Sequence, residues 1–115
     1  MIAGMGALAG LIAVALGAFG AHALQSGFDD KQAGWWDTAT LYLLVHAALA
    51  TAVSISDRAK FGVAALTLLI GAVIFAGTLY AMALGAPRWL GAVTPIGGVG
   101  LLIGWGLMAW TALKA

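Results

Sequence analysis

Charged residues are so sparse in this chain of 115 residues that they divide it into long uncharged stretches. Only nine residues, 8% of the chain, carry a formal charge, and four uncharged stretches cover residues 1–28, 38–56, 61–87 and 89–113. About 20 consecutive apolar residues in a helix, rising about 1.5 Å each, cross a hydrocarbon core of about 30 Å. Each stretch is therefore long enough for one membrane span.

The composition excludes several classes of protein. With 63% hydrophobic residues and so few charges, the chain cannot cover itself with a water-soluble surface. A net charge of +1 without a basic cluster argues against binding to nucleic acid, because phosphate neutralisation needs several Lys or Arg on one face. The chain has no cysteine, which excludes disulfides, thiol catalysis, Cys-ligated zinc and iron–sulfur clusters.

The four stretches predict helices and not barrel strands. They are continuously apolar and rich in Ala, Leu and Gly, without the alternation of period two that marks a barrel strand. We therefore expect an all-α integral membrane bundle in which residues 1–115 form a single domain. The predicted transmembrane helices cover about residues 2–24, 36–55, 61–84 and 90–113, and the second is the shortest.

The connections between these helices carry turn and capping residues. Residues 25–35 form a short polar loop, and Ser56 or Asp57 is expected to cap the third helix. Gly85 is expected to end the third helix, and Pro87 prevents its continuation.

The basic residues predict an orientation. With four spans, both termini lie on the side of Arg58, Lys60 and Lys114, and the opposite side carries Lys31 and Arg88. Basic residues concentrate on the cytoplasmic side, so this bias of three to two predicts cytoplasmic termini in a bacterial inner membrane.

One alternative concerns the first span. The sequence Ala21-His22-Ala23 after an apolar stretch resembles a signal-peptidase site, which would make this span a cleaved signal. Against this alternative, the apolar run has no basic residues before it and is long for a signal peptide.

Small residues four positions apart predict close helix packing. Such pairs form a shallow groove that lets another backbone approach. The predicted packing residues are Gly6, Gly10, Gly17, Ala21, Gly100 and Gly104. We expect most of these faces to meet another helix of the same chain. A remaining face is left for a homo-oligomer or for a larger membrane complex, with membrane lipids around the rest.

Polar side chains within the spans form the candidate site. An ionisable group inside a bilayer is costly, which draws attention to the two histidines. The predicted cluster consists of His22, Tyr42, His46, Thr78, Tyr80, Thr94 and Pro95. Within the fourth helix, Pro95 is expected to free a carbonyl near Gly91 and to kink the helix. Two interpretations remain: an outward-facing cavity for a small polar molecule, lipid headgroup or ion, or hydrogen bonds that only join the helices.

The sequence gives no sign of an enzyme or of a bound cofactor. Apart from Asp37 at the start of the second predicted helix, no Asp or Glu lies inside a predicted span, and no phosphate-binding loop or zinc-protease motif is present. His22 and His46 differ in predicted depth by a helical turn or more, which argues against paired haem ligation, and we expect no metal.

Four short motifs in order resemble the YgdD-like family of small inner-membrane proteins. They lie at Gly17 to His22, at Trp36 with Ala39, Tyr42, His46 and Ala47, at Phe75 to Tyr80, and at Thr94 to Gly98 followed by Gly104 and Trp105. The resemblance spans nearly the whole chain. It implies a four-helix membrane protein and implies no established activity.

Two functional hypotheses follow. The first is a structural or accessory membrane protein that packs through its Gly and Ala faces with itself or with a larger complex. The second is a binding or transport module that uses the polar cluster around His22, Tyr42, His46 and Thr94.

Overall fold

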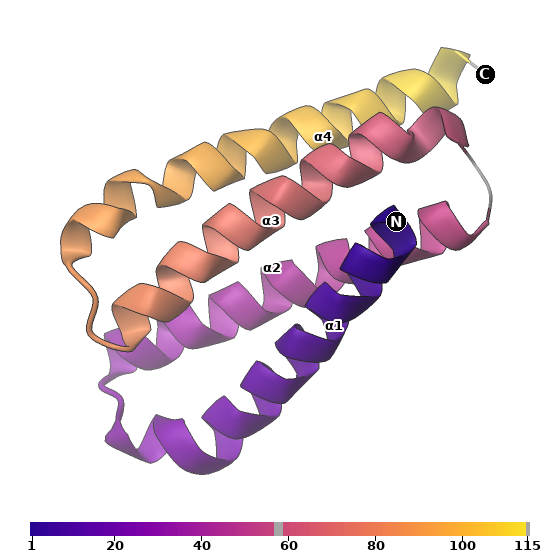
Figure 1. Cartoon of the computed structure of the whole chain (residues 1–115). Coiled ribbons are helices and arrows are strands. Elements are labelled where there is room, and N and C mark those ends of the chain that lie inside the picture. Colours follow the sequence, from indigo (N-terminus) through magenta and orange to yellow (C-terminus); the bar gives the residue numbers. More distant parts are fainter. Residues whose placement is uncertain (57–58, 115) are drawn as a thin grey trace.

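The described chain forms four long α-helices. They run antiparallel, with both termini at the same end of the bundle (Figure 1). The computed structural model describes residues 1–56 and 59–114. The helices are α1 (Ile2–Phe19), α2 (Asp30–Ile55), α3 (Gly62–Ala83) and α4 (Thr94–Lys114). All four spans are long and apolar enough to cross a membrane. The prediction of an all-α bundle of four transmembrane helices is therefore confirmed.

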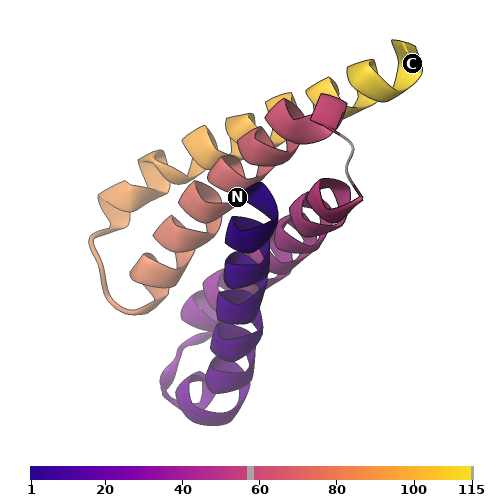
Figure 2. The same cartoon turned by 45° about the vertical axis from the view of Figure 1, so that its right-hand side comes forward.

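The helices pack mainly in chain order. α1 packs against α2, α2 against α3, and α3 against α4, while α1 and α3 share only a small contact. Within the described residues, α1 and α4 form no extensive interface. Figure 2 shows α1 inclined to the α3–α4 pair. The bundle is therefore open on one side, with α3 as its most buried helix.

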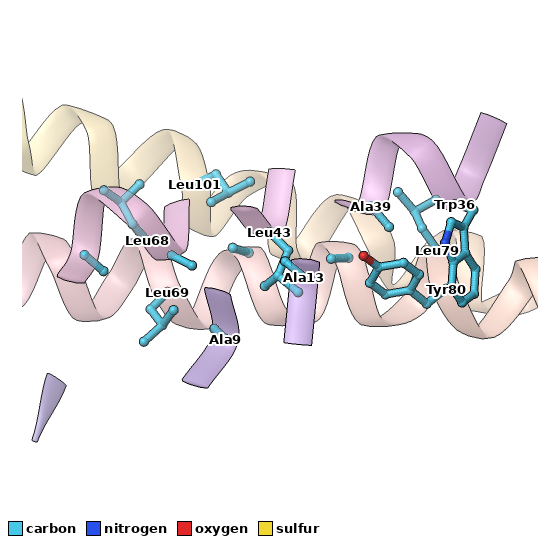
Figure 3. Close-up of a cluster of buried hydrophobic side chains, with 14 of the residues drawn as sticks. Ala9, Ala13, Trp36, Ala39, Leu43, Leu68, Leu69, Leu79, Tyr80 and Leu101 are labelled. Atoms are coloured by element: carbon cyan, nitrogen blue, oxygen red, sulfur yellow. The ribbon is translucent and has the colours of Figure 1, made fainter. Parts of the chain in front are cut away.

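Alanine and leucine build most of the core. Alanines such as Ala9, Ala13 and Ala39 are buried between the helices, and Trp36 and Tyr80 lie together at one end of the cluster (Figure 3). Many large apolar side chains, including Leu8, Ile70 and Leu102, are exposed instead. An exposed apolar exterior around a core of small residues is what a bundle in lipid requires.

The second helix is longer than the sequence predicts. It begins at Asp30, six residues before the predicted start, and with 26 residues it is the longest helix of the four. The Asp29 carboxylate accepts a hydrogen bond from the Gln32 backbone amide, and the Gln32 side chain accepts one from the Asp29 amide. This capping box starts the helix inside the stretch that the sequence assigns to a polar loop.

The connections confirm one capping prediction and contradict another. Gly85 has φ of +104°, and the amides of Gly85 and Ala86 donate to the carbonyls of Met82 and Ala81, so α3 ends at this glycine as predicted. Ser56 does not cap α3. Its hydroxyl donates to carbonyls of the last turn of α2, and α3 begins after a 3₁₀ turn over Ala59–Phe61. Asp57, the other predicted cap, lies outside the described residues.

The first and last helices also begin or end differently from the prediction. α1 passes into a π-helical turn over Gly20–Leu24 and a 3₁₀ turn over Gln25–Gly27. The segment before α4 is a 3₁₀ turn over Arg88–Ala92, and α4 begins only at Thr94. Pro95 therefore lies in the first turn of α4, where no amide donor is needed, and the predicted kink within a longer helix is wrong.

Candidate functional site

Trp36 joins α2 to the end of α1. Its indole Nε1 donates to the Leu16 carbonyl over 2.8 Å, and the side chain is only 2% exposed. Gly20 makes this possible, because a Cβ at that position would overlap the Trp36 ring. The π-helical turn and its glycine thus leave room for an indole between the two helices.

Tyr80 continues the same contact onto α3. The Tyr80 ring lies edge-on to Trp36, with 4.6 Å between ring centroids. Its hydroxyl shares a hydrogen bond of 2.7 Å with the Thr40 hydroxyl of α2. A third bond nearby runs from the Gln32 side-chain amide to the Ala83 carbonyl over 3.1 Å. These polar groups join α2 to α3 near the end of the bundle that lies opposite the termini.

Thr78 and Thr94 join α3 to α4. Their hydroxyl oxygens lie 2.6 Å apart and share a hydrogen bond. The Thr78 hydroxyl also lies 3.0 Å from the carbonyls of Ile74 and Phe75, and the Thr94 hydroxyl lies 3.2 Å from the Leu90 carbonyl. Each hydroxyl therefore has a partner within the chain, and Thr94 is oriented by the turn that precedes α4.

His46 is buried between α2 and α4. Its Nε2 accepts a hydrogen bond of 3.0 Å from the Trp105 indole, and its Nδ1 lies 2.6 Å from the Tyr42 carbonyl. An indole nitrogen only donates and a carbonyl only accepts, so the two contacts assign a neutral imidazole with its proton on Nδ1. The histidine is 5% exposed and acts as a hydrogen-bonded link between two helices.

A groove opens beside His46, and we call it the α2–α4 groove. Its volume is about 650 Å³. The residues that line it are Tyr42, Val45, His46, Phe75, Pro95, Gly98, Val99, Leu101, Leu102 and Trp105. Tyr42 is 38% exposed at its edge, with its ring 4.6 Å from that of Phe75. Of the predicted cluster, only Tyr42, His46 and Pro95 share this groove.

The remaining predicted residues lie elsewhere. His22 is exposed on the π-helical turn after α1. His46 lies about 24 Å along α2 from Asp30, the first residue of that helix. Thr78 and Thr94 form their own pair, and Tyr80 pairs with Thr40. Among the described residues, no group of three or more His, Asp or Glu side chains is arranged to hold a metal. The predicted cluster is thus three separate interhelical contacts and one exposed histidine.

Sequence reasoning missed Trp105, Thr40 and Trp36 as members of these contacts. Trp105 lies in the middle of a predicted span, far from the boundaries where tryptophan usually concentrates. A tryptophan at this depth needs an acceptor for its N–H within the protein, which is a usable signal. Trp36 and Thr40 carried no such signal, because their roles depend on which helices are neighbours.

Five of the six predicted packing residues face another helix of this chain. A Cβ on Gly6 would meet the Thr51 hydroxyl, one on Gly17 the Thr40 methyl, and one on Gly104 the Leu68 side chain. Gly10 faces Ala47, and Gly100 faces the backbone of Gly71. The sixth residue, Ala21, is exposed on the turn after α1.

The fold and these contacts define a small four-helix integral membrane protein joined by buried glycines and interhelical hydrogen bonds. Residues 16–98 match the family described as "Protein of unknown function (DUF423)". The chain therefore belongs to the DUF423 family, and the family resemblance seen in the sequence is confirmed.

The relatives are membrane proteins of the UPF0382 group. A UPF0382 membrane protein of Staphylococcus epidermidis is 42% identical, over 96% of this chain and 93% of the relative. The inner membrane protein YgdD of Escherichia coli is 41% identical, over 94% of this chain and 86% of the relative. YwdK of Bacillus subtilis, also named a membrane protein, is 36% identical over 96% and 94%. No solved structure matches this chain.

Proposed function

We propose that this chain is an accessory membrane protein that packs against itself or against a larger membrane complex. The observation that carries the proposal is a set of outward-facing glycines. Apart from its own turn of helix backbone, a Cβ on Gly4, Gly77 or Gly106 would meet no atom of the described chain within 4 Å. A glycine within a helix costs roughly 0.5–1 kcal/mol relative to alanine, and in a membrane it allows close approach by another backbone. These positions suit contact with a second protein.

The hydrogen bonding of the spans supports the same proposal. In the described part of the chain, every buried side-chain nitrogen and oxygen has a hydrogen-bond partner. Four of the polar groups of the predicted cluster, His46, Thr78, Tyr80 and Thr94, are engaged in contacts between helices. Side chains used in this way support a structural role for the spans.

The test is a set of leucine substitutions at the outward glycines. Gly4→Leu, Gly77→Leu and Gly106→Leu leave the contacts of the chain intact but obstruct an approaching backbone. We expect at least one of them to reduce the oligomer or complex seen by chemical cross-linking in native membranes. Gly34→Leu is the matched control, because Gly34 is equally open but lies near the start of α2.

The result also separates the two kinds of partner. A homo-oligomer survives purification of this chain alone in native mass spectrometry, whereas a contact with a larger complex is lost. If cross-linking is the same for the wild type and all three variants, the glycines do not serve association and the proposal fails.

We further propose that both termini are cytoplasmic. The end of the bundle with the termini carries Lys60 and Lys114, the sequence has Arg58 two residues before Lys60, and the opposite end carries Lys31 and Arg88. A reporter fused after Ala115 is expected to be active only as a cytoplasmic enzyme. A periplasmic signal from the same fusion would reverse the orientation.

A further inference from the structure

Two basic side chains lie beside the same tryptophan, at the end of the bundle opposite the termini (Figure 1). The Arg88 guanidinium, in the 3₁₀ turn before α4, lies 5.9 Å from the centroid of the Trp35 ring of α2. Lys31 is one helical turn before Trp35, so these two side chains share a side of α2. Both basic residues are exposed, and in the described chain neither pairs with a carboxylate. The surface around Trp35 is therefore positively charged and open to an anion.

The carboxylates at this end of the bundle lie on other sides of α2. Asp29 caps the helix through its hydrogen bond with a backbone amide. Asp30 and Asp37 are about two turns apart and share one side of α2, about a third of a turn around the helix from Lys31. Lys31 and Tyr42 are about three turns apart and share the other side. The positive side of α2 thus leads to the α2–α4 groove, which Tyr42 lines.

The groove begins near the two basic residues and continues into the bundle. Tyr42 lies two turns after Trp35 on α2, and Pro95 lies in the first turn of α4. Trp105, also in the lining, is about 15 Å further along α4 than Pro95. The walls are apolar, and Leu102 among them is exposed. In a membrane-spanning bundle the groove therefore opens sideways to the lipid chains.

The depth of these residues follows from Asp37. A carboxylate is costly inside hydrocarbon, so Asp37 marks the boundary, and residues 38–55 of α2 then cover about 27 Å of a core of about 30 Å. Tyr42 lies about 8 Å below this boundary, and its hydroxyl makes no hydrogen bond in the described chain. From the end of the bundle inward, the surface thus presents two cations, a hydroxyl and an apolar groove. A phospholipid presents a phosphate, ester carbonyls and acyl chains in the same order.

We propose that an anionic phospholipid binds here, with its phosphate between Arg88 and Lys31 and one acyl chain in the α2–α4 groove. Charge complementarity selects this occupant, because a ligand without a phosphate would fill the groove and leave both cations unpaired. A guanidinium binds phosphate through two parallel hydrogen bonds, and Trp35 holds this one in place. The Tyr42 hydroxyl donates to an ester carbonyl. The net negative charge of the headgroup favours an anionic lipid over a zwitterionic one.

The first experiment tests the headgroup. The full chain in detergent is titrated with phosphatidylglycerol, and native mass spectrometry measures the affinity for the first bound lipid. Arg88→Gln and Lys31→Gln are each expected to weaken it about fivefold, and phosphatidylcholine with the same chains is expected to bind the wild type more weakly. Lys60→Gln is the matched control, because Lys60 also lies over an aromatic ring, that of Phe61, but at the opposite end of the bundle. It is expected to bind as the wild type does.

The second experiment tests the groove. Apart from its own helix turn, a Cβ on Gly98 meets only the Phe75 ring, at an ordinary 3.9 Å, so Gly98→Leu is expected to fold and to weaken binding at least fivefold. Val45→Trp fills the groove from α2 and is expected to do the same. Gly106→Leu, on α4 but outside the groove, is the control. Circular dichroism and the melting curve establish that the variants are folded.

Four results would overturn the proposal. The first is equal affinity for phosphatidylglycerol and phosphatidylcholine, and the second is equal affinity of Arg88→Gln and Lys60→Gln. The third is displacement of the lipid by glycerol phosphate, which has the phosphate without the chains and would show a site for free anions. The fourth is a dimer of the chain that excludes phosphatidylglycerol, which would assign the groove to a second copy.

Discussion

Glycine serves different purposes at the two outer interfaces of the bundle. Between α3 and α4, a Cβ on Gly71 would stand 2.9 Å from the Gly97 carbonyl oxygen and 2.9 Å from the Leu101 amide nitrogen. Between α1 and α2, the atoms that a new Cβ would meet belong to side chains at Gly17 and Gly20: the Thr40 methyl and the Trp36 indole. At Gly71 and Gly97 the α3–α4 interface brings two backbones together, whereas at Gly17 and Gly20 the α1–α2 interface receives side chains. Backbone cannot move aside as a side chain can, so the two should respond differently to the same mutation.

The largest effect is expected at Gly97. Gly97→Ala places a Cβ against the amide nitrogen and Cα of Phe75 and 2.7 Å from the Gly71 carbonyl oxygen, so α3 and α4 must separate. We expect a destabilisation of about 3 kcal/mol, the upper end of the usual cost of overpacking. Reversible unfolding in mixed micelles measures it. Gly98→Ala is the matched control, and an equal loss in both variants would contradict the backbone-contact interpretation.

A somewhat smaller loss, about 2 kcal/mol, is expected for Gly20→Ala, because the Trp36 side chain can shift. A double-mutant cycle tests whether the new Cβ is obstructed by a side chain or by backbone. In the Trp36→Leu background the cost of Gly20→Ala should fall by at least half. In the Phe75→Ala background the cost of Gly97→Ala should persist, because the obstructing atoms are backbone. Rescue in both backgrounds would remove the distinction between the interfaces.

A moderate effect is expected for the hydroxyl pair that supports α3 and α4. Thr78→Val and Thr94→Val each remove one partner of the shared hydrogen bond, and each should lower stability by about 0.6–2 kcal/mol. Since the two hydroxyls bond to each other, the double variant should lose less than the sum of the single ones. Additive losses would show that each hydroxyl contributes through its own helix carbonyls alone.

The smallest effect is expected at a glycine that belongs to neither interface. Apart from its own turn of helix backbone, the new Cβ of Gly106→Ala meets no atom of the described chain within 4 Å, so the change should raise the stability of the isolated protein by about 0.5–1 kcal/mol. Unfolding in detergent, where partners are absent, measures this gain. A loss of stability would mean that Gly106 faces a contact within the chain.

Much of the fold was predictable because the membrane imposes it. Uncharged stretches of sufficient length located all four helices, and the end of α3 at Gly85 followed from the need for positive φ. The start of α2 was less predictable, since charged residues near Asp29 suggested a loop while the capping box with Gln32 makes them helical. Pro95 was predicted inside a helix because its neighbours are apolar, and apolar residues also form the 3₁₀ turn before Thr94.

The candidate site was less predictable than the fold. Helix periodicity places Tyr42 and His46 one turn apart on α2, and the structure keeps them beside the same groove. The partners of these and the other polar residues depend on which helix lies opposite and at what height. Trp105 for His46, Thr40 for Tyr80 and Thr94 for Thr78 are products of packing, which a single sequence does not specify.

The chain-order packing of the bundle bears on how the protein is made. Each helix contacts chiefly the one synthesised just before it, so a helix that inserts into the bilayer finds its packing partner already inserted. Helices that have already packed need not separate when the next helix inserts. In a bundle whose last helix packs against its first, they would have to. The hydrogen bond from Trp105 to His46, which joins residues 59 apart, then forms only after α4 has inserted, and it links α4 to α2.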